Sequence, residues 1–141
     1  MAGYSGTPLL KKLGYREGRR ALFSALPEDL EMLATGPGFA SVDRLEALDE
    51  PVPAGPYDVI HIFEKNRETL EQKLPDLRAA LDPSGMIWVS WPKKASGVKT
   101  TLDGNVVRTL ILAAGLVDIK VCAVDAIWSG LKVVIPVADR P

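Results

Sequence analysis

The chain alternates short apolar runs with segments whose apolar residues recur at helical spacing. Apolar runs of strand length occur at residues 20–25, 40–45, 57–63, 86–90, 117–124 and 131–137. The run at 57–63 is apolar on both faces, which is typical of a central strand in a parallel sheet. The pattern therefore predicts a sheet of about six strands.

The clearest helix pattern covers residues 66–81. Its stripe of leucines, with charged residues on the other faces, is typical of a helix packed against a sheet; the stripe consists of Leu70, Leu74, Leu77 and Leu81. Pro75 lies inside this segment, so we expect a kink or a break there.

Two further helices are expected between strands. Pro27 begins one that runs to about Ala34, because Gly-Pro-Gly follows at residues 36–38. Another begins after residue 103, capped by Asp103 or Thr101, and ends at Gly115.

Alternation of strands and helices predicts a mostly parallel sheet covered on both faces. The last two strands are joined by about six residues, 125–130, which is too short for a parallel crossover. We therefore predict a single three-layer, Rossmann-like α/β domain over residues 1–141 that ends in an antiparallel hairpin. Residues 1–14 form an N-terminal arm with one helical turn, which Thr7 caps and Gly14 ends.

Two short motifs resemble a known enzyme family. They are Leu-Asp-Pro-Ser-Gly at residues 81–85, leading into a strand, and Ala-Gly-Leu at 114–116, leading into the final hairpin. Over roughly residues 57–137 this order of elements resembles the carboxyl-terminal half of class I S-adenosylmethionine-dependent methyltransferases. The resemblance implies a methyltransferase-like sheet that lacks the third strand.

The whole chain also resembles a bacterial family known as a domain of unknown function. Its motifs are Gly-Thr-Pro-Leu-x-x-Lys-Leu-Gly, Trp-Pro-Lys-x-x-Ser-Gly-Val and Asp-x-x-Trp-Ser-Gly-Leu, and this chain carries them at residues 6–14, 91–98 and 125–131. This resemblance implies no particular activity.

Charge and composition restrict the partners. The 17 basic and 18 acidic residues, with a pI near 5.8, give no overall attraction to nucleic acid or to an anionic membrane. No apolar run approaches the ~18 residues that cross a bilayer, and the start lacks a signal-peptide pattern. We therefore expect a cytoplasmic protein without a nucleic-acid or membrane partner.

The single cysteine and the single histidine predict no metal site. Cys122 lies in an apolar strand pattern and is expected to act as a small hydrophobe. His61 lies in the middle of a strand, where a hydrogen-bonded core histidine is more common than a catalytic base. We expect no catalytic residue from either.

The most informative segment is the acid-free stretch between Asp82 and Asp103. A buried strand there leads into a Trp-Pro-Lys-Lys loop, at the strand end where α/β proteins usually bind ligands. The candidate ligand-binding residues are Trp91, Lys93, Lys94, Ser96, Gly97, Lys99, Thr100, Asp125, Trp128 and Ser129. The lysines would bind a phosphate or carboxylate, and a tryptophan would stack on a planar group. The alternative is a solvated loop anchored by its tryptophan.

Three of these candidates lie in the connection before the last strand. If the hairpin lies beside the lysine loop, Asp125 is expected to pair with Lys93 or Lys94. The alternative is a packed hairpin that Trp128 plugs.

The segment after the first strand argues against a standard methyltransferase site. Methyltransferases need glycines there so that the backbone can approach the cofactor, whereas this chain has Ala-Leu-Pro-Glu-Asp at residues 25–29 and its next glycine at 36. Acids at a helix start also disfavour an anionic nucleotide. Asp43 or Glu46 could hold a ribose.

The leading functional hypothesis is therefore a non-catalytic module that binds a small anion or a protein carboxylate without a cofactor. The alternative is a divergent methyltransferase with S-adenosylmethionine as its cofactor. A third interpretation is a purely structural homodimer or subunit.

Overall fold

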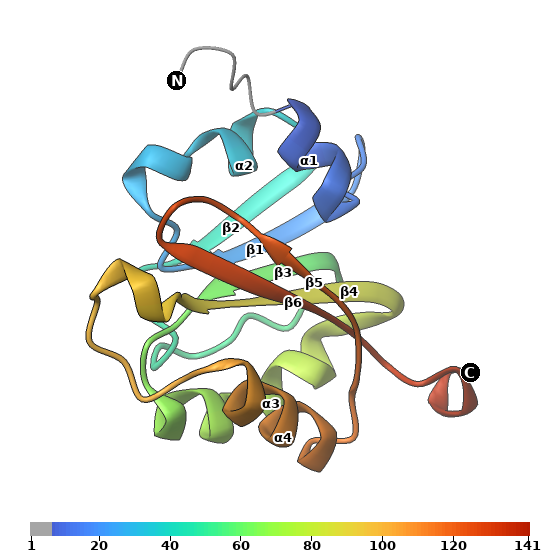
Figure 1. The fold of residues 1–141 in the computed structure, drawn as a ribbon. Coiled ribbons are helices and arrows are strands. Elements are labelled where there is room, and N and C mark those ends of the chain that lie inside the picture. Colours follow the sequence, from blue (N-terminus) through green and yellow to red (C-terminus); the bar gives the residue numbers. More distant parts are fainter. Residues whose placement is uncertain (1–6) are drawn as a thin grey trace.

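Six strands form one sheet in the order β2-β1-β3-β4-β6-β5 in the computed structural model, which describes residues 7–141 (Figure 1). The strands are β1 (Arg20–Ser24), β2 (Ser41–Leu45), β3 (Tyr57–Phe63), β4 (Leu81–Pro92), β5 (Val117–Ala123) and β6 (Trp128–Val134).

Strands β1 to β4 run parallel, and β6 runs antiparallel to both β4 and β5. The predicted C-terminal hairpin is therefore confirmed. The carboxyl ends of the parallel strands share one edge of the sheet, called here the carboxyl edge, and their starts share the opposite, amino edge. The turn between β5 and β6 also lies at the carboxyl edge, because β6 starts there.

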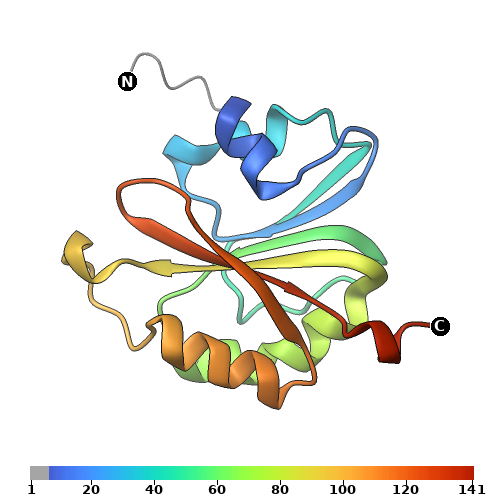
Figure 2. The same ribbon diagram turned by 45° about the vertical axis from the view of Figure 1, so that its right-hand side comes forward.

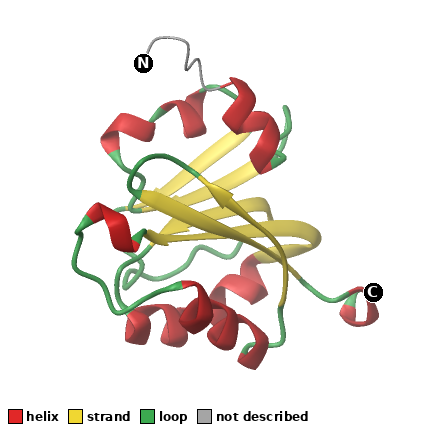
Figure 3. Ribbon diagram, viewed as in Figure 1, coloured by secondary structure: helices red, strands yellow, loops and turns green. Residues whose placement is uncertain are grey.

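Helices cover both faces of this sheet, which confirms the three-layer α/β prediction (Figures 1, 2 and 3). One face carries α1 (Thr7–Leu13) and α2 (Met32–Thr35), and the other carries α3 (Arg67–Ala80) and α4 (Gly104–Ala113). Three single-turn 3-10 helices complete the described elements; they are Glu28–Leu30, Lys94–Ser96 and Val137–Asp139.

The core is divided between the two faces by the alternation of side chains along each strand. On β3, Ile60 and Ile62 pack toward α3 and α4, whereas Val59 and Phe63 pack toward α1 and α2. We call these sides the α3/α4 face and the α1/α2 face. All four side chains are buried, so β3 is the central strand that its sequence predicts.

Helix α3 is continuous across its proline. Its first turn is capped by Asn66, whose Oδ1 accepts a hydrogen bond from the Thr69 N–H at 3.0 Å. Leu74 and Leu77, which flank Pro75, are both buried in the α3/α4 core. The expected break is therefore wrong: the proline removes one helix hydrogen bond, but burial of its neighbours holds the helix in one piece.

The helix expected to begin at Pro27 is divided in two. The 3-10 helix Glu28–Leu30 comes first, and the four-residue helix α2 follows. Neither Pro27 nor Glu31 gives its helix a side-chain cap, and the Gly-Pro-Gly segment ends α2 after one turn. Too few residues remain for a longer helix to form.

Strands β4 and β6 differ from prediction at their ends. The motif at residues 81–85, which was expected to precede the strand, is an irregular part of β4; there the Asp82 carboxylate accepts hydrogen bonds from the Ser84 N–H at 2.9 Å and its hydroxyl at 2.7 Å. Strand β6 already includes Trp128, so only residues 124–127 connect it to β5. It stops before Pro136, which has no N–H for pairing.

The arm predicted at residues 1–14 packs on the sheet as far as it is described. Leu9 and Leu13 of α1 are buried on the α1/α2 face. The fully buried Trp88 donates its Nε1–H to the Leu13 carbonyl at 2.8 Å. Residues 1–6 and the Thr7 side chain, with the expected cap, lie outside the described part.

Among the described residues, no helix combines the length and apolar character that crossing a membrane requires.

Candidate functional site

Loops from five strand ends gather at the carboxyl edge, where ligands of open α/β sheets usually bind. The ends of β1 to β4 and the β5–β6 turn all lie there. The lysine loop, which we define as residues 93–101, follows β4 at this edge (Figure 1).

The hydroxyl groups of Ser96 and Thr100 in the lysine loop form hydrogen bonds with the protein backbone. The Ser96 hydroxyl donates to the Lys93 carbonyl at 2.6 Å and accepts from the Val98 N–H at 3.1 Å. The Thr100 hydroxyl donates to the Lys65 carbonyl at 2.7 Å. These hydroxyls therefore hold the loop in shape, around a left-handed turn at Gly97 with φ 74°.

Lys93 joins the lysine loop to the β5–β6 turn. Its Nζ donates to the backbone carbonyl of Asp125 at 2.7 Å, and its N–H donates to the Ile127 carbonyl at 2.7 Å. The Asp125 carboxylate instead accepts from the N–H groups of Ile127 at 2.9 Å and Trp128 at 2.7 Å. The loop and the turn thus meet as expected, but through a lysine–carbonyl contact and not an ion pair.

Lys94 and Lys99 are both exposed. Neither takes part in an ion pair within the described part of the chain. Their charges remain available to a ligand.

The two candidate tryptophans lie on opposite faces of the sheet. Trp91 is 7% exposed and belongs to the α3/α4 core. Trp128 packs on the α1/α2 face, edge-on to Phe63 at 5.2 Å between ring centroids. Ser129 is paired with Trp91 across β4 and β6. The sheet therefore prevents both rings from stacking on one ligand.

The end of β1 has an unusual backbone. Ala25 has φ 54° and is the only non-glycine residue with positive φ in the described ranges. Its N–H donates to the Leu45 carbonyl at 2.9 Å. The preceding hydroxyl, on Ser24, is fully buried and has no hydrogen-bond partner among the described groups. Such strain and unpaired polar atoms cluster at functional sites.

The two acids considered for a ribose differ in availability. Asp43 lies in the middle of β2 and accepts a hydrogen bond from the Tyr57 hydroxyl at 2.5 Å. Burial, with this hydrogen bond second, raises the pKa of Tyr57 to about 12. Glu46 directly follows β2 at the carboxyl edge and is exposed. Asp43 is exposed as well, but only Glu46 lies at the strand end and is therefore the better placed acid for a ligand at this edge.

His61 belongs to a buried polar network. Its Nδ1 lies 2.5 Å from the Tyr15 hydroxyl, and its Nε2 lies 2.7 Å from the Ser90 hydroxyl. Burial lowers the pKa of His61 to about 3, so the ring is neutral near neutral pH. The expectation of a hydrogen-bonded core histidine is confirmed, although the sequence did not indicate its partners.

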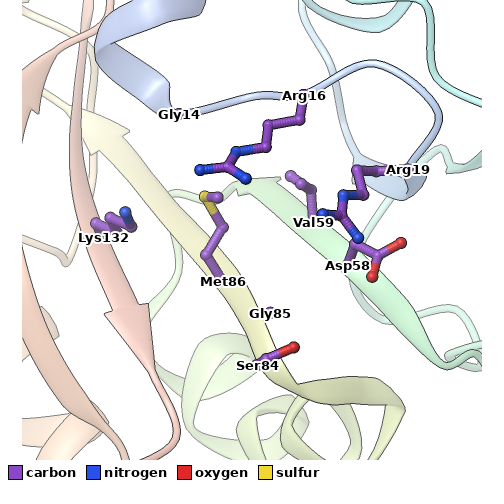
Figure 4. Close-up of a pocket in the computed structure, with 9 residues that line it drawn as sticks. All are labelled: Gly14, Arg16, Arg19, Asp58, Val59, Ser84, Gly85, Met86 and Lys132. Atoms are coloured by element: carbon purple, nitrogen blue, oxygen red, sulfur yellow. The ribbon is translucent and has the colours of Figure 1, made fainter.

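A pocket of about 420 Å³ lies at the opposite, amino edge, on the α1/α2 face (Figure 4). It is lined by Gly14, Arg16, Arg19, Asp58, Val59, Ser84, Gly85, Met86 and Lys132. None of these residues was a candidate from the sequence, because they are scattered along the chain and only the strand pairing brings them together.

The fold is shared with solved S-adenosylmethionine-dependent methyltransferases. A TehB-like enzyme of this class from Corynebacterium glutamicum superposes with a TM-score of 0.66 at 9% identity, over 90% of this chain and 85% of that one. A methyltransferase from Aquifex aeolicus gives 0.66 at 16% identity, over 94% and 90%.

A third structure, Burkholderia thailandensis 1,6-didemethyltoxoflavin-N1-methyltransferase with bound S-adenosylhomocysteine, gives 0.63 at 11% identity, over 94% of this chain and 78% of that one. At these identities the likeness shows a methyltransferase-like Rossmann fold. No protein-family model and no curated protein matches the sequence, so the resemblance to the bacterial family stays a prediction.

Proposed function

We propose that this protein is a divergent methyltransferase that binds S-adenosylmethionine at the carboxyl edge, beside the ends of β1 and β2. The observation that carries the proposal is the left-handed Ala25 directly after β1, in a sheet shared with S-adenosylmethionine-dependent methyltransferases. The sequence alone ranked this function second, and the structural neighbours favour it over a non-catalytic module.

Among the residues after β1, Ala25 is the one whose backbone a cofactor can approach closely. A left-handed residue with a small side chain lets the backbone approach a ligand, which is the role of glycine in methyltransferases. Alanine is the smallest residue after glycine, and Ala25 is preceded by the Ser24 hydroxyl, which has no hydrogen-bond partner among the residues that the structure describes. Leu26 and Pro27 follow, so close approach is limited to Ala25 itself.

The acids after β1 do not oppose this cofactor. S-adenosylmethionine has no phosphate: its sulfonium and ammonium groups outweigh its carboxylate, and its net charge is positive. Glu28 and Asp29, both exposed, therefore attract it, whereas they would repel a phosphorylated nucleotide. The sequence argument against an anionic nucleotide is thus no argument against S-adenosylmethionine.

Glu46 would hold the ribose. A carboxylate can accept hydrogen bonds from two neighbouring hydroxyl groups at once, and Glu46 is exposed at the end of β2. When bound, the cofactor supplies an electrophilic methyl group on sulfur. The chain's own residues would orient it.

Calorimetric titration of the full chain tests the proposal. S-adenosylmethionine is expected to bind, and Glu46→Gln to weaken binding by about tenfold or more, the scale of a hydrogen bond to a charged group. Asp49→Asn is the matched control, because Asp49 is an exposed acid three residues further along. Absence of binding at millimolar cofactor, or equal losses in both variants, would overturn the proposal.

The second candidate function is the non-catalytic one, anion binding by the lysine loop. Lys94 and Lys99 favour it, because both are exposed in an acid-free loop and neither forms an ion pair with any residue of 7–141. Titration with inorganic phosphate tests it against the double variant of these lysines to alanine. The matched control replaces Lys11 and Lys12, which are exposed on α1. Equal behaviour of both double variants would rule it out.

The third interpretation, a homodimer or subunit, stays a prediction. The described edge strand β5 has Ile119 54% exposed and Val121 56% exposed. Light scattering at dilute concentration would distinguish a monomer from a dimer.

A further inference from the structure

The pocket at the amino edge gathers three cationic side chains around one carboxylate. Arg16 and Arg19 come from the segment before β1, Lys132 from β6, and Asp58 from β3. In the view of Figure 4, the Arg16 guanidinium lies just above the Met86 sulfur and the Lys132 ammonium group lies to its left. None of the three cations is in an ion pair within residues 7–141.

This arrangement is unfavourable without a ligand. Lys132 lies opposite Lys120 in the β5–β6 pairing, and like charges directly opposite one another destabilise a sheet. Burial lowers the pKa of Lys132, and the charges of Lys120 and Arg16 lower it further. A half-buried cation held among other cations is the arrangement expected where an anion binds.

Asp58, the one acid that lines the pocket, already accepts a backbone hydrogen bond. The Asp58 carboxylate accepts the Arg20 N–H at 2.9 Å, which fixes it at the start of β1 and β3. It therefore leaves an excess of positive charge facing the pocket.

The pocket also has an apolar floor and a wall of backbone. Val59 and Met86 supply the apolar surface. The backbone of Gly14, in the left-handed conformation with φ 75°, forms the wall beside the Met86 and Lys132 side chains. A ligand that fits has an apolar part as well as a negative charge.

We propose that the pocket binds a small molecule with a phosphate or carboxylate group on an apolar body, held by Arg16, Arg19 and Lys132. Arginine pairs with both kinds of anion through two parallel hydrogen bonds, and lysine adds a point charge. The site is separate from the proposed cofactor site. Met86 and Pro92 of β4 are six residues apart, which is about 20 Å along a strand.

Phenyl phosphate and benzoate are suitable probes, with phenol and inorganic phosphate as controls for the charge and for the apolar body. Calorimetric titration of the full chain is expected to show binding of at least one of the two probes, with weaker binding of both controls. Affinity is expected to fall as ionic strength rises. Absence of binding by both probes, or equal affinity for inorganic phosphate, would overturn the proposal.

Amino-acid substitutions test whether the probes bind in this pocket. Arg16→Gln and Lys132→Met are each expected to lower the affinity about tenfold or more, while Lys65→Ala, an exposed lysine just after β3 at the opposite edge, leaves it unchanged. Lys132→Met is also expected to melt at or above the temperature of the wild type, because it removes a half-buried cation; this shows that the variant is folded. An equal loss in Lys65→Ala would mean non-specific binding and would contradict the assignment.

Discussion

The Tyr15 hydroxyl lies 2.5 Å from Nδ1 of His61, so a residue just after α1 completes a polar network in the centre of the sheet. On the other side of the ring, Nε2 lies 2.7 Å from the Ser90 hydroxyl. Stacking with Phe63, at 4.4 Å between ring centroids, excludes water from the imidazole. The network therefore binds α1, β3 and β4 together while the ring stays neutral.

His61 should make stability depend on pH. Burial lowers its pKa from 6.5 to about 3, so between these values the unfolded chain binds a proton that the folded chain does not. Stability is thus complete above about pH 6.5 and falls as pH decreases, by roughly 1.4 kcal/mol per pH unit. Urea unfolding at pH 7, 6 and 5 measures this slope.

The change of stability between pH 7 and pH 5 can be assigned to His61, because the chain has a single histidine. Glu31 and Asp82 have lowered pKa values and add their own dependence only below about pH 4.5. His61→Gln should therefore be nearly flat between pH 5 and 7. A variant with the wild-type slope would refute this account of the network.

Ala25→Gly should not destabilise the fold. Holding an alanine in the left-handed backbone conformation costs about 1–2 kcal/mol of folding free energy, which a glycine avoids. This gain offsets the greater conformational entropy of glycine in the unfolded chain. We expect a change between zero and about 1 kcal/mol in favour of the variant. Ala21→Gly, at a buried position near the start of β1, should instead cost about 1 kcal/mol. Equal losses in both variants would contradict a strained Ala25.

Lys93 and Lys94 should differ although they are neighbours. Lys93→Met removes the 2.7 Å contact with the Asp125 carbonyl and is expected to cost about 1–2 kcal/mol of unfolding free energy. Lys94→Met changes an exposed side chain and should stay within about 0.5 kcal/mol of the wild type. Thermal or urea unfolding of the two variants compares them, and similar values would contradict the structural role of Lys93.

Trp88→Phe should loosen α1 from the sheet. It leaves the buried Leu13 carbonyl without its hydrogen bond and opens space beside Leu13, at a cost of about 2 kcal/mol or more. Hydrogen exchange in residues 7–13 should increase more than exchange in α3, which lies on the other face. A uniform increase would show that Trp88 does not act through α1.

The sequence predicted the strands well because burial imposes their pattern. Residues 57–63 are apolar on both faces, and β3 has these bounds. The short β5–β6 connection predicted the reversed strand, since chain length alone excludes a crossover. The helix after Pro27 was predicted too long, because helix propensity does not reveal that Pro27 and Glu31 give their helices no side-chain cap.

The candidate site was only partly predictable. The local sequence indicated the lysine loop. It did not indicate that Lys93 would bind a backbone carbonyl, or that Trp91 and Trp128 would lie on opposite faces of the sheet. These outcomes depend on strand register, which sets the face of each side chain. The amino-edge pocket depends on register even more, since Lys132 reaches Arg16 only through the order of β3, β4 and β6.

Amide chemical-shift mapping with S-adenosylmethionine tests the central proposal most directly, because it reports both binding and position. The account predicts that the largest shifts occur at Ala25 and Glu46, with little change at Arg16 and Gly85 on the amino edge. Absence of saturable shifts, or shifts centred on the amino edge, would contradict cofactor binding at the carboxyl ends of β1 and β2.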